Sequence, residues 1–88
     1  MKASFKEVPV RTTLNGEAQI MDLRMHIAEA VYQNAANFEQ HKLAHRIAET
    51  DGEVELTDDE ANVIKRAVAE FRFFVQKPVL EMLGESFE

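Results

Sequence analysis

The sequence has no cysteine and no tryptophan, and its 88 residues include only three glycines and two prolines. Without cysteine the chain has no disulfide, no thiolate nucleophile and no sulfur ligand for zinc. The glycines stand alone at positions 16, 52 and 84, so no glycine-rich loop can cradle a phosphate. No serine has the flanking glycines of a nucleophile elbow. We therefore expect a protein that is not an enzyme and that uses no cofactor.

Long apolar runs are also missing. A membrane span needs about 18 consecutive apolar residues, and no segment approaches that length. Near the N-terminus Lys6 interrupts the region where a secretory signal would need apolar residues. We expect a cytoplasmic protein with no membrane partner.

Basic residues are scarce relative to acidic ones. Ten lysines and arginines stand against 16 aspartates and glutamates, which gives a formal net charge of -6. This charge opposes binding to phosphate backbones, so a nucleic-acid partner is not expected. The first 50 residues are balanced, whereas the segment from Asp51 to Glu60 contains acids and no base. One alternative function is therefore an acidic inhibitor that engages a basic partner.

The N-terminal part of the sequence predicts a β-hairpin over residues 5–21. Polar and apolar residues alternate there around Asn15 and Gly16, a dipeptide typical of tight hairpin turns. A three-residue turn with Gly16 in the left-handed conformation pairs Val10 with Ile20 and gathers the apolar side chains on one face. We therefore predict that register.

Apolar residues at three- and four-residue spacings predict helices in the rest of the chain. Asp22, Asn37 and Thr57 stand where helix N-caps are expected, and Pro78 should end or kink the third helix. The first two helices can also form one continuous helix, because no helix breaker separates them. The predicted helices cover residues 23–33, 38–49, 57–76 and 78–83, with a tail over residues 84–88.

These elements indicate one α+β domain over residues 1–88. A β-hairpin, or a three-stranded sheet that includes residues 54–56, should pack against three helices and a short C-terminal helix. The side chains expected to be the most buried are those of Val10, Ile20, Ile27, Val31, Ile47, Ile64, Val68 and Phe71.

Three residues in the second predicted helix have the spacing of a metal site. His41, His45 and Glu49 lie four residues apart, so all three project from one side of the helix and could offer two imidazoles and a carboxylate. A zinc peptidase motif would need a glutamate directly after the first histidine, where this chain has Lys42. We favour a solvated helix face, and metal binding remains an alternative function. His26 is predicted to be a half-buried packing residue.

Three large apolar residues point away from the predicted core. Phe73 lies opposite the apolar stripe of the third helix, and Met25 and Tyr32 lie away from the stripe of the first helix. An 88-residue domain has little second layer with which to cover such residues. We therefore predict a homodimer that forms over Phe73, or over Met25 and Tyr32.

Most of the chain also resembles a group of known proteins. The stretch that begins at Val8, VPVRTTLNGEAQIMDLRMHIAEAVYQ, is followed by DGEVELTDDEANVIKRAVAEF and by FVQKPVLEML. These segments resemble small uncharacterised proteins encoded in prophages and mobile elements of gut-type bacteria. The resemblance implies a role in phage assembly, in packaging or in modulation of the host, and it implies no functional residues.

Overall fold

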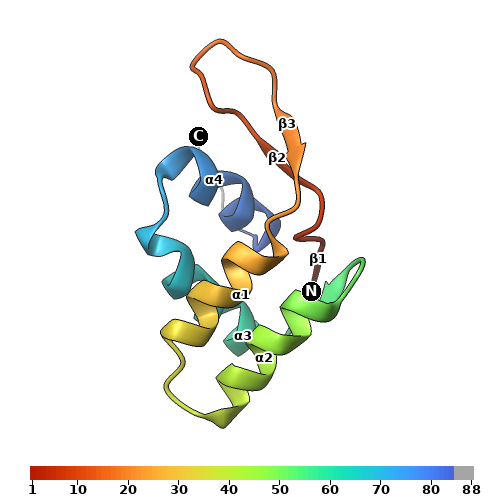
Figure 1. Ribbon diagram of the computed structural model, residues 1–88, viewed down its shortest axis with the longest axis vertical. Coiled ribbons are helices and arrows are strands. Elements are labelled where there is room, and N and C mark those ends of the chain that lie inside the picture. Colours follow the sequence, from red (N-terminus) through yellow and green to blue (C-terminus); the bar gives the residue numbers. More distant parts are fainter. Residues whose placement is uncertain (85–88) are drawn as a thin grey trace.

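The computed structural model of the protein describes residues 1–84 (Figure 1), so the predicted tail lies outside the described residues except for Gly84. Helices and short antiparallel strands make up the fold, which confirms the α+β class. The elements in chain order are β1 (Lys2–Ala3), β2 (Val8–Val10), β3 (Gln19–Met21), α1 (Arg24–Gln33), α2 (Phe38–Glu49), β4 (Val54–Glu55), α3 (Asp58–Ala67), the 3-10 helix η1 (Val68–Glu70) and α4 (Phe73–Met82).

The hairpin of β2 and β3 has a register one residue away from the predicted one. Val10 lies opposite Gln19, and Ile20 lies opposite Pro9. Proline has no backbone N–H, so it favours a pair in which the strand ladder does not need its nitrogen as a donor. A one-residue shift turns a strand residue to the other face of the sheet. The predicted burial of Ile20 is therefore wrong, because 65% of this residue is exposed.

The loop of the hairpin also differs from the prediction. Residues 11–18 have no strand pairing, and the amide of Gly16 donates to the carbonyl of Thr13 at 3.3 Å. Gly16 does not take the left-handed conformation, since Gly84 is the one residue of the described chain with a positive φ. The tip of the loop extends beyond the helices at the top of Figure 1.

Strand β4 pairs with β1 and not with the hairpin. Ala3 lies opposite Val54, and both side chains are buried. Beyond this pair, the amide of Leu56 donates to the carbonyl of Met1 at 2.7 Å. Residues 1–84 thus contain two separate two-stranded sheets, and the predicted three-stranded sheet is wrong. A two-residue strand such as β1 is too short for alternation to reveal it in the sequence.

Helices α1 and α2 are separate, and α2 has the predicted bounds. The side chain of Asn37 accepts a hydrogen bond from the amide of Gln40 at 3.0 Å, and the side-chain oxygen of Gln40 accepts one from the amide of Ala36 at 2.7 Å. Asn37 has an extended backbone, which stops α1 from continuing into α2. Helix α1 begins at Arg24 with Leu23 at its N-cap, so the prediction that Asp22 is the N-cap is wrong; the carboxylate of Asp22 accepts a hydrogen bond from the amide of Arg24 at 3.1 Å from one position further out.

Helix α3 begins with the predicted capping box. The amide of Glu60 donates to the hydroxyl of Thr57 at 3.2 Å, and the amide of Thr57 donates to the carboxylate of Glu60 at 2.9 Å. The helix ends at Ala67, and η1 continues it for three residues. The predicted helix over residues 57–76 is therefore wrong in its C-terminal part.

Helix α4 begins before the proline that was expected to end a helix. Pro78 lies inside α4, and the N–H that it lacks would have bonded to the carbonyl of Phe74. The break before α4 lets the chain turn back, as Figure 1 shows. Val79 and Leu83 are then buried. The break between η1 and α4 therefore allows α4 to pack against the core. Pro78 is accommodated within α4.

Both sheets and all four α-helices of the described chain contribute residues to the core. Most predicted core residues are buried, whereas Phe71 is only partly buried, because it lies at the break after η1. Phe5, which was predicted only as the start of the hairpin, is fully buried. The largest fully buried side chains are Phe5, Ile27, Leu43, Ile47, Ile64, Leu83, Val8, Val10, Val31, Val68 and Val79.

Candidate functional site

The three residues predicted to form an interface lie on two different surfaces. Met25 and Tyr32 belong to α1, and both line a hollow between α1 and α2. Phe73 is the first residue of α4 and lines a separate groove between α4 and the hairpin. Because the break after η1 places Phe73 on α4, its predicted position on the third helix is wrong. All three residues are exposed, as predicted.

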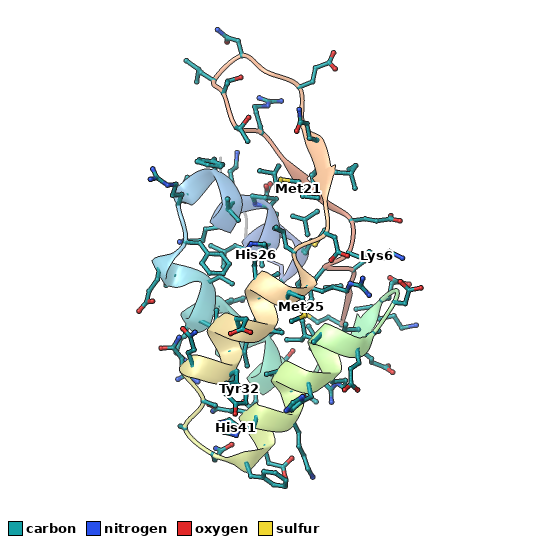
Figure 2. The ribbon with its side chains drawn as sticks, in the orientation of Figure 1. Lys6, Met21, Met25, His26, Tyr32 and His41 are labelled. Carbon is teal, nitrogen blue, oxygen red and sulfur yellow. The ribbon has the colours of Figure 1, made fainter. Side chains whose placement is uncertain are left out.

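The first surface, here called the α1–α2 face, is a hollow with large side chains at its edge and small ones at its base. Met25 and Tyr32 are seven residues apart on α1 and therefore lie on one side of that helix, as Figure 2 shows. They are 58% and 49% exposed. The hollow has a volume of about 260 Å³ and is lined by Met25, Ala28, Tyr32, Ala44, His45 and Ala48, with Glu29 beside them.

Aromatic contacts hold Tyr32 in place on this face. Its ring stacks on the imidazole of His41 with centroids 4.6 Å apart and an angle of 15° between the planes. The ring of His45 meets Tyr32 edge-on at 6.1 Å and 85°. Figure 2 shows His41 beside Tyr32. Both histidines thus support a tyrosine from the neighbouring helix, which leaves Tyr32 as a preordered and exposed contact residue.

The structure does not assemble the metal site that His41, His45 and Glu49 offered as an alternative. Within residues 1–84 no group of three or more histidine, aspartate or glutamate side chains could hold a metal ion. His41 instead stacks on Tyr32, while Glu49 lies exposed at the end of α2. His26 is exposed rather than half-buried, and it lines a different hollow beside Phe71.

The second surface, here called the α4 groove, lies between the hairpin loop and α4. Its volume is about 590 Å³. Its apolar lining consists of Pro9, Leu14, Ala18, Phe73, Phe74 and Pro78. Three charged residues, Arg11, Lys77 and Glu81, also line it. Sequence reasoning missed this groove, because it depends on the break before Phe73 and on the position of the hairpin loop over α4.

The acidic run from Asp51 to Glu60 is partly neutralised by basic residues from elsewhere in the fold. Asp51 pairs with Lys6, and the guanidinium of Arg24 lies 3.5 Å from the same carboxylate. The hydrogen bond from Lys6, together with the positive charges nearby, lowers the pKa of Asp51. These ion pairs connect the acidic run to the segment between β1 and β2 and to α1. Asp51 therefore has a structural role.

Glu60, at the other end of the run, is neutralised in the same way. Arg46 lies 2.7 Å from its carboxylate. Burial alone would raise the pKa of Glu60, but the amide of Thr57 and the guanidinium of Arg46 outweigh it and lower the pKa. The capping box and this ion pair account for Glu60 without a partner protein.

No polar or charged side chain is buried among residues 1–84. No helix in this part of the chain is both long enough and apolar enough to span a membrane.

Comparison with protein-family models, with curated proteins and with solved structures gives no match. The resemblance to prophage-encoded proteins therefore stays a prediction.

Proposed function

We propose that the protein is a non-enzymatic protein-interaction module that acts as a homodimer, with the α1–α2 face as the dimer interface. The observation that carries this proposal is the hollow with an alanine base between exposed Met25 and Tyr32. Small residues at the base of a groove let a second helix approach closely, and the large side chains at its edge supply apolar area. The prophage resemblance suggests phage assembly, packaging or host modulation as the setting in which this dimer acts.

The energetics favour a second copy as the occupant of the α1–α2 face. Burying one large apolar side chain contributes about 1.5–3 kcal/mol, and a twofold contact buries each such residue twice. A twofold axis that crosses α1 at right angles brings Met25 of one copy to Tyr32 of the other. Methionine sulfur packs favourably on aromatic rings. This arrangement pairs a thioether with an aromatic ring at each end of the contact, and it places Glu29 of each copy near the axis between the two ends.

The proposal predicts that a charge on the α1–α2 face dissociates the dimer. The change is Met25→Glu, which would place an unpaired carboxylate in the buried contact. Sedimentation equilibrium at micromolar protein should show a dimer for the unchanged chain. The variant should be a monomer, with a dimer dissociation constant at least about tenfold higher. Met25 is exposed, so circular dichroism should show an unchanged fold.

The matched control is Met21→Glu. Met21 is also exposed, but it lies on β3 and outside the α1–α2 face. This substitution makes the same chemical change and the same change in net charge, so it should leave the dimer intact. A monomer at every concentration of the unchanged chain would contradict the proposal, as would equal weakening by both substitutions.

A further inference from the structure

We propose that the α4 groove binds an extended peptide segment of a partner protein, and that this segment carries large apolar residues flanked by acidic ones. This proposal goes beyond the dimer and does not depend on the α1–α2 face, because the two surfaces share no lining residue.

The apolar part of the groove is unusually exposed for so small a protein. Leu14 is 89% exposed, which makes it the most exposed large apolar side chain that the structure describes. Phe74, on the opposite wall, is 41% exposed. Contiguous exposed apolar surface of this kind commonly marks a binding site. Here the surface is concave, so it suits inserted side chains better than a flat partner.

The groove carries a local excess of positive charge. Its charged lining consists of Arg11, Lys77 and one carboxylate, Glu81. Within residues 1–84 no carboxylate forms an ion pair with Arg11 or Lys77. In a protein of net charge -6, the surface beside the most exposed apolar side chain thus has a charge of +1.

These cations favour an acidic partner segment. A carboxylate that approaches Arg11 or Lys77 gains an ion pair without breaking one that exists in the described residues. Screening limits attraction to about 8 Å at physiological salt, so a short peptide interacts mainly with these local cations. An anionic membrane is a larger surface and also faces the net negative charge of the whole domain. The observations therefore favour a peptide over a lipid surface.

The length of the groove sets the length of the segment. Helix α4 has ten residues and is therefore about 15 Å long. An extended chain covers about 3.3 Å per residue, so five or six residues span the helix. Apolar side chains in the middle of such a segment would reach Leu14 and Phe74, and acidic residues on either side would reach Arg11 and Lys77.

Fluorescence anisotropy with two synthetic probes tests the proposal. One probe is a labelled octapeptide with a centre of leucine and phenylalanine and with two glutamates at each end; the other has lysine in place of each glutamate. The acidic probe should bind the full chain saturably at micromolar concentration, and more weakly as salt rises. The lysine probe should not bind. Binding of both probes, or of neither, would overturn the proposal.

Single substitutions locate the binding site. Arg11→Glu and Lys77→Glu should each raise the dissociation constant of the acidic probe about fivefold or more, and Leu14→Ser should do the same through lost apolar contact. Lys2→Glu is the matched control, because Lys2 is an exposed cation on β1 and outside the groove. Equal weakening by Lys2→Glu would contradict the assignment.

Two further measurements separate this proposal from its alternatives. The Met25→Glu variant should bind the acidic probe as tightly as the unchanged chain. Failure of the dimer proposal would therefore not by itself contradict the peptide site in the α4 groove. Vesicles that contain phosphatidylserine should not sediment the protein. Sedimentation with these vesicles, combined with no binding of the acidic peptide, would replace the peptide by a membrane surface and overturn the proposal.

Discussion

Phe5 is the single residue on which the N-terminal segment depends most. Its side chain is fully buried, and its carbonyl accepts a hydrogen bond from the amide of Leu23 at 2.8 Å. The next residue, Lys6, pairs with Asp51 in the turn between α2 and β4. Phe5 therefore fixes the chain between β1 and β2 against the start of α1, and the hairpin takes its direction from that point.

We predict that Phe5→Ala destabilises the protein more than Phe71→Ala. Truncation of a fully buried phenylalanine costs about 3–5 kcal/mol, whereas Phe71 is only partly buried and has less contact to lose. Urea unfolding followed by circular dichroism measures both changes. Phe5→Leu keeps most of the apolar volume and should cost less than Phe5→Ala. Equal losses for Phe5→Ala and Phe71→Ala would contradict the importance of Phe5.

The junction between η1 and α4 depends on one side chain from α4. The side-chain amide of Gln76 donates to the carbonyls of Val68, Ala69 and Phe71 at 3.2, 3.1 and 3.3 Å. The carbonyl of Val68 also accepts from the amide of Phe71 at 2.9 Å, so the bonds from Gln76 matter most at Ala69 and Phe71, where the chain breaks after η1. Gln76 thus satisfies the end of one helix from the first turn of the next.

We predict that Gln76→Ala loosens this junction. Removing the donor takes its hydrogen bond from the part-buried carbonyl of Phe71, which costs about 1–3 kcal/mol. Chemical denaturation should show this loss, and hydrogen exchange should quicken at the amides of α4. Gln33→Ala is the control, since Gln33 is an exposed glutamine at the end of α1. Equal effects of the two substitutions would show that the Gln76 bonds do not hold the junction.

The elements that could be predicted from the sequence are those that local chemistry determines. Helix α2 and the start of α3 follow from a cap residue and a stripe of apolar residues within one turn of each other. The pairing of β1 with β4 and the register of the hairpin depend on tertiary contacts that local chemistry does not reveal. The break before Phe73 had no local signal, because no glycine or proline marks it.

The candidate surfaces were predictable only in part for the same reason. Met25 and Tyr32 could be assigned to an exposed face, because both lie on a helix whose period the sequence reveals. Tyr32 and His41 lie on different helices, so their stacking could not be predicted from the spacing within one helix. That spacing suggested a metal site as an alternative. The α4 groove joins the hairpin loop to α4, and no pattern within either segment indicates their proximity.

Charge is distributed unevenly over the whole molecule, which measures 41 × 24 × 22 Å. Asp51 and Glu60 are neutralised by ion pairs, whereas Glu53 and Glu55, on and beside β4, form no ion pair within the described chain. The α1–α2 face carries one acidic residue, Glu29, which lies between Met25 and Tyr32 on α1. Most of the net negative charge therefore lies away from the proposed dimer interface, and it acts on dimerisation from a distance.

This distribution predicts a dimer that weakens at low salt. Two copies with net charge -6 repel each other, and the screening length grows from about 8 Å at physiological salt to about 30 Å at 0.01 M. Charges outside the interface then act across it, so the dimer dissociation constant should rise several-fold at low salt. Sedimentation equilibrium at both salt concentrations measures this change. A chain with Glu53→Gln and Glu55→Gln should show a smaller rise, because these substitutions remove charge without touching the α1–α2 face. A dimer that tightens at low salt would mean that attraction across the interface outweighs the repulsion between the two copies.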